Sequence, residues 1–583
     1  MLAYVDRQTL YWAALTVSVL LLSYWLRPGQ PVPKFPPQWS GSGITAGNDA
    51  ANAKQSLLCQ DPGTGQTLGL VSAAHPDQVR QQIELAKTAS KEWRQSSFHQ
   101  RRLLLKILLQ HIIDNQEAIC RVSALDSGKP MVDAAFGEVL VTCEKIRWLL
   151  SEGERWLRPE SRSTGRMMFY KKAWVEFHPV GVVGAIVPFN YPFHNIFNPL
   201  TAALFAGNGI VIKVSEHASW SSRLYERIIH AALQAAGAPK ELVQIVTGYG
   251  DAGNALVTGG VDTVIFVGST AVGKKVMAAA AETLTPVTLE LGGKDAFIVL
   301  DDADLNQVTQ TALRGAFQGA GQNCMGAERF LLQAPIHDAF VSRAAAVAQK
   351  LRQGPTASEQ AGRVMDVGAT CLPGLAEKIA SLVDDAVAQG AKVAAGGGRP
   401  QTNGSGQFFP PTILTGITHS MRIWREEVFG PVMAVAAFNT DDEAVALAND
   451  CPFGLGSSVF SRNTARARNL GSRIEAGMTS INDFAATYMS QSLPFGGVKE
   501  SGFGRFGGIE GLRALCIPKS VTEDRFPWLM RTDIPPLLQY PVKAAAFDFV
   551  CGLVKMFYGL TLRDQLQGIV KIVRALLERE PTS

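Results

Sequence analysis

The sequence predicts an α/β protein built around a doubly wound parallel sheet. Short segments rich in β-branched residues, mostly bounded by glycine or proline, alternate with longer segments in which apolar residues recur at helical spacing. Such alternation is typical of a parallel sheet with helices on both faces. Strands are expected at residues 180–187, 209–214, 263–267 and 296–300, and the clearest helices at residues 79–93 and 102–120.

Length and composition indicate a large globular protein. A chain of 583 residues is long enough for two or three folded units, and 46% hydrophobic against 18% charged residues fits a buried core rather than disorder. The net charge is only +4, and no basic stretch with interleaved aromatics occurs, so nucleic acid is not an expected partner. The eight cysteines include no C-x-x-C pair, which argues against the usual zinc sites and a disulfide framework. We expect no metal, and free thiols in a reducing compartment.

The N-terminal region differs from the rest of the chain. After a short segment (residues 1–8), residues 9–26 carry no charge and have aromatic residues near both ends. As a helix they span roughly 27 Å, enough for the hydrocarbon core of a bilayer. We expect a transmembrane anchor, with a cleaved signal peptide and a buried helix as alternatives; Arg27 and Pro28 follow where a cleavage site would need small residues. Residues 27–50, rich in Pro and then Gly, are expected to form a tether.

The C-terminal region, residues 524–583, is expected to be a helical extension. Its second half places apolar residues on one helical face, at positions 562, 566, 569, 570, 573 and 577. Three interpretations remain open: a tail that packs on the folded domain, an interfacial membrane helix, and a second spanning helix.

Two motifs carry candidate catalytic groups. Residues 288–294, TLELGGK, place Glu290 at the end of an apolar strand before two glycines. Residues 317–324, FQGAGQNC, lead through a glycine-rich turn to Cys324. A buried carboxylate is more often structural, and a buried cysteine is usually inert packing. A polar, glycine-rich turn, however, exposes a thiol and favours a nucleophilic role.

Two further motifs favour binding. Residues 187–192, VPFNYP, place Asn190 in a turn stiffened by prolines. Residues 266–273, FVGSTAVG, follow a strand with glycine-spaced residues that lead into a helix. Such a turn can bring backbone N–H groups and a helix N-terminus to a phosphate, although an ordinary strand–helix turn has the same pattern.

Together these motifs resemble the aldehyde dehydrogenase superfamily over residues 51–521. Glu290 and Cys324 lie 34 residues apart, as in that family. Residues 213–216 (KVSE), 426–432 (EEVFGPV) and 494–502 (PFGGVKESG), together with Asn482, also match. With its apolar N-terminus and C-terminal extension, the chain resembles the membrane-anchored long form found in plants and fungi.

The resemblance implies a three-part fold. It predicts a Rossmann-like NAD-binding domain (residues 51–290), an α/β catalytic domain (291–481), and a return to the NAD-binding domain (482–523). A small β oligomerisation arm is expected from residues 165–178 and 515–521, with residues 167–170 and 173–177 forming a hairpin around Lys171 and Lys172. Such arms usually pair subunits into homodimers or homotetramers.

The resemblance also assigns catalytic roles. Cys324 attacks the aldehyde carbonyl, and the Asn190 amide with the Cys324 backbone N–H stabilises the oxyanion. Hydride transfer to NAD leaves a thioester, and Glu290 activates the water that hydrolyses it. A CoA-acylating dehydrogenase is one alternative, which Glu290 disfavours because such relatives generally lack this glutamate. A catalytically inactive membrane scaffold is the other.

For the cofactor, the resemblance assigns the pyrophosphate to the turn that includes Gly268, Ser269 and Gly273. It assigns the adenosine ribose to Lys213 and Glu216. A carboxylate at Glu216 repels a 2′-phosphate and therefore favours NAD over NADP. The nicotinamide ribose and ring are assigned to Glu427 and Phe429.

The substrate side departs from the common family pattern. Asn198-Pro199 stands where many members have an aromatic residue followed by lysine, and Asn323 and Met325 flank the catalytic cysteine. The identity of the aldehyde therefore stays open. Apolar residues near the Asn190 turn suggest a medium- or long-chain aliphatic aldehyde, although phenylalanines are more often core: Phe189, Tyr191, Phe193 and Phe197.

We expect the catalytic region to face the cytosol from an endomembrane, in particular the endoplasmic reticulum. NAD and reduced thiols favour that compartment, since an oxidising lumen threatens Cys324. Arg27 and Lys34 after the apolar run balance Arg7 and the amino terminus before it, so charge does not decide the orientation. The sequon at Asn403 is compatible with either side.

Overall fold

The computed structural model describes residue 16 and residues 56–356, 364–398, 407–530 and 532–577. The chain divides into two compact units: residues 1–156 with 179–515, and residues 157–178 with 516–583. Three predicted features lie outside the described residues: the anchor except for Thr16, the whole tether, and Asn403. Within the described part, no helix is both long enough and apolar enough to cross a bilayer.

The first unit contains the predicted parallel sheet. Its six strands run in the order β19-β9-β8-β5-β6-β7, with β9, β8, β5, β6 and β7 parallel and β19 antiparallel to β9. Strand β8 has the predicted bounds, and β5 and β6 fall inside theirs. The strands are β5 (Val182–Ile186), β6 (Gly209–Lys213), β7 (Val243–Val246), β8 (Thr263–Val267), β9 (Val287–Glu290) and β19 (Gly502–Phe503).

A second sheet follows in the same unit. Its order is β12-β13-β14-β11-β10-β16-β17, parallel except for β12 at one edge. The two parallel sheets confirm the predicted α/β class. The strands are β10 (Asp295–Val299), β11 (Ala327–Gln333), β12 (Lys392–Ala395), β13 (Thr412–Thr415), β14 (Val432–Phe438), β16 (Ser457–Phe460) and β17 (Ser480–Ile481). Two small pairs are β1 (Ser56–Gln60) with β2 (Thr67–Ser72), and β15 (Phe453–Gly454) with β18 (Val498–Lys499).

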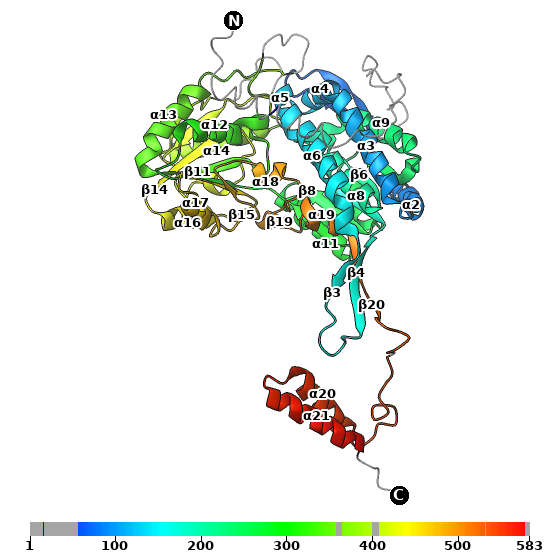
Figure 1. Cartoon of the computed structure of the whole chain (residues 1–583). Coiled ribbons are helices and arrows are strands. Elements are labelled where there is room, and N and C mark those ends of the chain that lie inside the picture. The colour runs from blue at the N-terminus through cyan, green and yellow to red at the C-terminus, as the bar shows by residue number, and fades with distance from the viewer. Residues whose placement is uncertain (1–15, 17–55, 357–363, 399–406, 531, 578–583) are drawn as a thin grey trace. The chain divides into compact units, whose positions relative to one another are not determined.

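Helices lie against both sheets, and α12, α13 and α14 accompany the sheet that contains β11 and β14 (Figure 1). Those near the first sheet are α2 (Pro76–Trp93), α3 (Phe98–Asp114), α4 (Gln116–Ser127), α5 (Met131–Ala134), α6 (Val141–Trp148), α7 (Glu154–Leu157), α8 (Pro192–Ala206), α9 (Ser219–Ala235), α10 (Gly250–Thr258), α11 (Thr270–Ala281) and α19 (Gly508–Arg513). The others are α12 (Leu305–Phe317), α13 (His337–Ala348), α14 (Leu375–Ala388), α15 (Arg422–Arg425), α16 (Asp441–Asn449), α17 (Thr464–Gly471) and α18 (Ala486–Met489).

One predicted helix is divided in two. The expectation of a single helix over residues 102–120 is wrong, because α3 ends at Asp114 and α4 begins at Gln116. Between them Asn115 has φ −123° and ψ 20°, and both its backbone N–H and its side-chain amide donate to the His111 carbonyl. An asparagine side chain that competes for a backbone carbonyl in this way terminates a helix.

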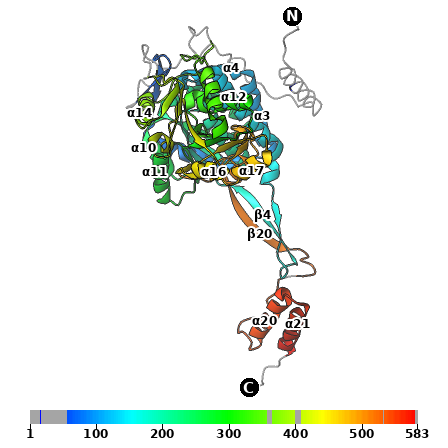
Figure 2. The ribbon, with the colours of Figure 1, turned by 90° about the vertical axis from the view of Figure 1, so that its left-hand side faces the viewer.

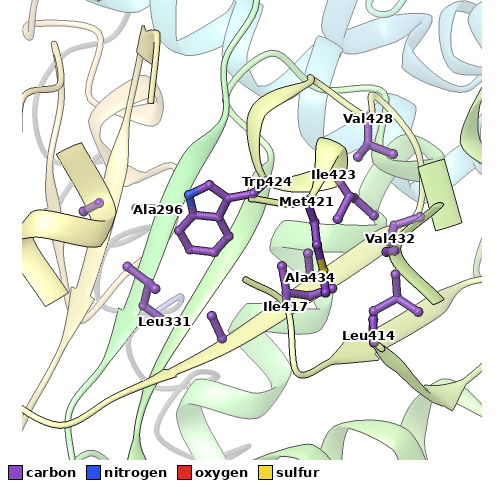
Figure 3. Packing of buried hydrophobic residues seen from close by; sticks show 14 of the residues in the cluster. Ala296, Leu331, Leu414, Ile417, Met421, Ile423, Trp424, Val428, Val432 and Ala434 are labelled. Carbon is purple, nitrogen blue, oxygen red and sulfur yellow. The ribbon is translucent and has the colours of Figure 1, made fainter. Parts of the chain in front are cut away.

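The core beside the second sheet positions one of the predicted motifs. Trp424 is fully buried there, among aliphatic side chains from the strands and from α14 (Figure 3). Val428 is buried in the same cluster, so residues buried in this core lie on both sides of Glu427. Burial of both side chains fixes the path of residues 426–432, since close-packed interiors leave little freedom.

The second unit contains the predicted β arm, with one correction. Its three strands run in the order β20-β4-β3, and β4 lies beside β20 in both views (Figures 1 and 2). Residues 167–170 belong to the turn before β4 and do not form a strand; the Lys171 N–H donates to the Met168 carbonyl, and Gly165 has φ 73°. Lys171 and Lys172 begin β4, where they form ion pairs with Asp524 and Glu523 on β20. The strands are β3 (Glu160–Arg162), β4 (Lys171–Pro179) and β20 (Cys516–Asp524).

The described part of the C-terminal extension contains two helices. These are α20 (Ala546–Tyr558) and α21 (Leu562–Leu577), which pack side by side (Figures 1 and 2).

Candidate active site

A cavity of about 760 Å³ in the first unit brings together the three predicted catalytic residues. Asn190 follows β5, Glu290 ends β9, and Cys324 precedes β11. The cavity wall therefore comes from both sheets, and sequence positions as far apart as 190 and 324 meet there. Ligand sites of α/β proteins commonly lie beyond the carboxyl ends of parallel strands.

The loop before Cys324 is held in an unusual backbone conformation. After α12 ends at Phe317, three successive residues adopt left-handed φ values of 60°, 57° and 73° at Gly319, Ala320 and Gly321. The buried side chain of Gln322 then locks the loop: its Nε2 donates to the Gly319 carbonyl at 2.9 Å, and its Oε1 accepts from the Cys371 N–H at 2.7 Å. The thiol is thus presented to the cavity by a fixed turn.

The two glycines after Glu290 allow the two catalytic motifs to approach closely. A Cβ atom at Gly293 would lie 2.1 Å from the Cys324 carbonyl oxygen, and one at Gly292 would lie 2.6 Å from the Glu427 carboxylate. Only glycine permits either contact. These contacts give a physical reason for the glycine pair in the TLELGGK motif.

Glu290 and Cys324 line the same cavity. Glu290 is 2% exposed, and its Oε1 has no hydrogen-bond partner among the described residues. Burial, with the Glu427 and Asp295 charges adding to it, raises the pKa of Glu290 to about 8. Burial, followed by the Glu290 charge, raises the pKa of the Cys324 thiol well above its usual range. The Cys324 thiol therefore keeps its proton in the resting enzyme. A thiolate forms only if Glu290 or a water molecule accepts that proton.

Asn190 is oriented by the loop before Cys324 and by α8, the helix that follows it. Its Nδ2 donates to the Gln322 carbonyl at 3.0 Å, and its Oδ1 accepts from the Asn195 side chain at 3.2 Å. A side-chain amide carries two N–H groups, so one remains available for a substrate oxygen. Asn190 lines the cavity together with Cys324.

A buried ion pair behind Asn190 was not predicted from the sequence. Lys129 and Glu138 are 2% and 1% exposed, and Lys129 Nζ lies 2.6 Å from both Glu138 Oε1 and the Asn190 carbonyl oxygen. Glu138 Oε2 accepts the backbone N–H of Phe193 at 2.7 Å. The pair therefore holds the Asn190 turn on both sides. Glu138 reaches it from a π-helical turn (Ala135–Leu140), a feature often found at functional sites.

Glu427 and Phe429 are held by a second unpredicted ion pair. Lys294 Nζ lies 2.5 Å from Glu328 Oε2, and the Glu328 carboxylate accepts the backbone N–H groups of Val428 and Phe429, each at 2.9 Å. Phe429 has φ 52°, which is costly for a bulky residue and is maintained here by these bonds. Glu427 accepts the Gly293 N–H at 2.9 Å, and burial raises its pKa to about 7.

The residues assigned to the pyrophosphate and the adenosine ribose lie at the carboxyl ends of β8 and β6, which flank β5 in the first sheet. Lys213 ends β6, and its Nζ lies 3.1 Å from Glu216 Oε2. Ser269 follows β8 as the N-cap of α11, but its side chain makes no capping hydrogen bond. Its hydroxyl and the first N–H groups of α11 are therefore suited to a phosphate. Gly268 and Ser269 line the cavity, whereas Gly273 is buried in α11 against Leu291, so its role is close packing.

The comparisons with known proteins agree with this geometry. A model described as the aldehyde dehydrogenase family matches residues 49–521. The chain is 41% identical over 509 residues to an aldehyde dehydrogenase-like protein of Schizosaccharomyces pombe, covering 86% of this chain and 96% of that one. The chain belongs to the aldehyde dehydrogenase family. A 4,4'-diapolycopene aldehyde oxidase of Methylomonas sp is 34% identical over 505 residues, covering 86% and 92% of the two chains.

A solved structure of this family extends the comparison to the cofactor. A Mycobacterium tuberculosis aldehyde dehydrogenase complexed with NAD+ superposes with a TM-score of 0.75 at 28% identity, covering 81% of this chain and 95% of that one. The present aldehyde dehydrogenase is therefore an enzyme that oxidises aldehydes with a nicotinamide dinucleotide. The uncapped Ser269 hydroxyl and the Lys213–Glu216 pair fit such a cofactor.

Proposed function

We propose that this enzyme converts an aldehyde to a carboxylic acid with NAD, through a thioester on Cys324 that is hydrolysed with Glu290 as the base. The observation that carries the proposal is that Cys324, Asn190 and the buried Glu290 line one cavity, where Glu290 Oε1 has no hydrogen-bond partner among the described residues. NAD supplies the hydride acceptor. Aldehyde-dependent NADH formation by the wild-type chain, and its loss in Cys324→Ala, tests the assignment.

The side chains divide the work as follows. A water molecule accepts the proton of the Cys324 thiol, and the sulfur attacks the carbonyl carbon of the aldehyde. The carbonyl oxygen becomes an oxyanion that accepts hydrogen bonds from the second Asn190 amide N–H and the Cys324 backbone N–H; one such donor is typically worth about 3–4 kcal/mol. After hydride loss, Glu290 takes a proton from the attacking water and the C–S bond breaks.

Water rather than CoA is proposed as the acyl acceptor. Glu290 supplies a buried base next to the acylated sulfur, and this base serves a water molecule directly. NADH formation without CoA supports hydrolysis. NADH formation that requires CoA favours the acylating enzyme, and no NADH with any aldehyde favours a non-catalytic membrane scaffold.

NAD is proposed as the preferred cofactor over NADP. Lys213 and Glu216 stand together at the end of β6, and the Glu216 carboxylate is partly exposed beside the Lys213 ammonium group. The carboxylate accepts ribose hydroxyl groups and repels a 2′-phosphate. The ratio of kcat/KM values for NAD and NADP checks this preference.

The aldehyde is proposed to be aliphatic and of medium or long chain. The part of the cavity around Cys324 is lined largely by aromatic and thioether side chains: Phe136, Tyr191, Met325, Phe484, Tyr488 and Met489. The relative named for 4,4'-diapolycopene aldehyde supports a large apolar substrate. A rise of kcat/KM along a chain-length series of aldehydes is expected, and a preference for short or charged aldehydes contradicts it.

Attachment to the endoplasmic reticulum membrane through residues 9–26, with the catalytic region in the cytosol, is also part of the proposal. It rests on the uncharged apolar run and on the need of Cys324 for a reducing compartment. Protease treatment of sealed microsomes is expected to degrade the catalytic region. Protection until detergent is added, or a glycan on Asn403, contradicts this orientation.

We further propose that the arm pairs subunits into a homodimer or homotetramer. Its three-stranded sheet has β3 and β20 as outer strands, and Ile517 on β20 is 53% exposed. Open strand edges are commonly covered by a partner. Light scattering at micromolar concentration is expected to show at least a dimer, and a monomer contradicts the proposal.

A further inference from the structure

The C-terminal helices α20 and α21 pack through small residues. A Cβ atom at Gly552 would lie 2.9 Å from the Gly568 carbonyl oxygen, and one at Gly568 would lie 2.3 Å from the Met556 nitrogen. The two backbones therefore approach as closely as glycine allows. Phe549 and Ala575 are buried with Leu537 and Ala545 in a small core of their own. The inner faces of the pair are thus already covered.

The outer faces are also apolar. On α20 the exposed residues recur at three- and four-residue spacing, which places them on one side of the helix. On α21 the face predicted from the sequence is the exposed one. The side chains concerned are each at least 41% exposed: Phe547, Val550, Val554, Tyr558, Leu562, Leu566, Ile569, Val570, Val573, Leu576 and Leu577. Helices of a soluble protein normally turn polar residues to solvent, so this surface indicates a binding site.

Charge indicates what binds there. Residues 543–577 contain five lysines and arginines but only two aspartates. Arg563 and Arg574 line a groove together with Leu562, Leu566 and Val570, so cations border the apolar face. Lys571 lines the same groove, where it forms an ion pair with Asp548 of α20 at 2.9 Å. A second copy of this hairpin would bring like charges together. An anionic surface with an apolar interior, by contrast, satisfies both features.

We propose that the hairpin α20–α21 docks on anionic phospholipid bilayers. Its outer apolar face enters the boundary between headgroups and acyl chains, while Arg563 and Arg574 contact the phosphate and carboxylate groups of the lipids. An amphipathic helix with basic residues beside its apolar face binds membranes in this way. The attachment is separate from residues 9–26 and from aldehyde oxidation, and it lays the C-terminal extension flat on the surface.

The native thiol of Cys551 provides a local test. Cys551 is partly exposed on α20, four residues after Phe547 and three before Val554. The full chain is treated with a charged, membrane-impermeant maleimide, alone, with phosphatidylcholine vesicles, and with vesicles that also contain phosphatidylserine. Labelling at Cys551 is followed by peptide mass spectrometry. Cys143, which is also partly exposed, is the internal control.

We expect anionic vesicles to slow labelling of Cys551 by about tenfold or more, because each basic residue near the surface contributes roughly 1 kcal/mol. Neutral vesicles should have a much smaller effect, and Cys143 should not change. Arg563→Glu/Arg574→Glu should restore rapid labelling on anionic vesicles. The matched charge reversal Lys350→Glu/Lys392→Glu, at exposed positions of the first unit, should leave the protection intact.

Three results overturn the proposal. If neutral and anionic vesicles slow the labelling of Cys551 equally, the basic side chains do not contribute to membrane binding. Slow labelling without vesicles that depends on protein concentration identifies a second copy as the partner. Slow labelling at every concentration, with or without vesicles, shows that the hairpin packs on its own chain. Each readout is independent of aldehyde turnover, so failure here is distinct from failure of the proposed reaction.

Discussion

The catalytic end and the cofactor end of the cavity are built differently. Around Cys324 the polar groups are anchored by buried partners: Lys129 and Glu138 behind Asn190, and Gln322 within the loop. The cofactor end comprises Ser269, which lines the cavity and is exposed and uncapped, and the Lys213–Glu216 ion pair at the end of β6, which does not line the cavity and leaves Glu216 partly open to solvent. The first end is preorganised, whereas the second is completed by its ligand. Substitutions should therefore cost most at the catalytic end.

The largest effect is expected for Cys324→Ala. Removal of the nucleophile should lower kcat by about 10⁴-fold or more. NAD affinity should change little, because the residues assigned to the cofactor, at the ends of β6 and β8 and at Glu427 and Phe429, do not include the thiol. Steady-state NADH formation measures kcat, and calorimetric titration with NAD measures the cofactor affinity. A large loss of NAD binding would show that the two ends are not independent.

Asn190→Ala should follow. Loss of one oxyanion donor typically lowers kcat by about 10²–10³-fold. KM should change less, since the donor acts on charge that develops in the transition state. Asn195→Ala is the matched control, because Asn195 donates to Asn190 Oδ1 and to the Pro188 carbonyl but is not assigned to the oxyanion, and its loss should cost far less. An equal loss of kcat in both variants would mean that catalysis depends on the shape of the whole turn and not on the Asn190 amide as an oxyanion donor.

Lys129→Met tests the buried support. It leaves the Glu138 carboxylate buried without its cation, and breaking such a pair typically costs about 3–5 kcal/mol. Lys172→Met, at a half-exposed pair on the arm, should cost about 1 kcal/mol or less. Urea unfolding of both variants gives the comparison. Similar values for the two would mean that the Lys129 pair does not stabilise the fold.

The pH dependence has a defined sign. Because burial raises the pKa of Glu290 to about 8, the carboxylate needed as base is the minor form below that pH. The deacylation rate should therefore rise with pH, by about tenfold per unit well below 8, and level off above it. Single-turnover deacylation between mildly acid and alkaline pH measures this. The rising limb should be absent in Glu290→Gln.

The smallest effect is expected at the cofactor end. Glu216→Gln removes the charge that repels a 2′-phosphate, so the NAD preference should fall by about tenfold while kcat with NAD stays nearly constant. Ratios of kcat/KM for NAD and NADP measure it. A large fall of kcat with NAD would give Glu216 a role beyond cofactor selection.

Sequence and structure agree where local patterns carry the information. Strand β8 and the strand–turn–helix at Ser269 follow from residue spacing alone, and the two catalytic motifs meet in one cavity, as the family resemblance implied. The break at Asn115 and the turn at residues 163–170 depend on single side-chain and backbone choices that spacing does not reveal.

The supporting ion pairs could not be predicted either. No sequence pattern singles out Lys129 and Glu138, and only the tertiary fold buries them behind Asn190. The same holds for Lys294 and Glu328, which lie 34 positions apart and hold the backbone at Phe429. These ion pairs form because segments distant in the sequence pack together. The periodicity of apolar residues does not predict such packing.

The most direct test of the account is a single-turnover experiment with Glu290→Gln. The variant is mixed with an aldehyde and NAD, quenched, digested and analysed by mass spectrometry. We predict a burst of NADH that matches the active sites, and an acyl group on the peptide that contains Cys324, because acylation persists while deacylation is slow. Absence of both the burst and the acyl group would contradict the account and assign Glu290 to activation of the thiol.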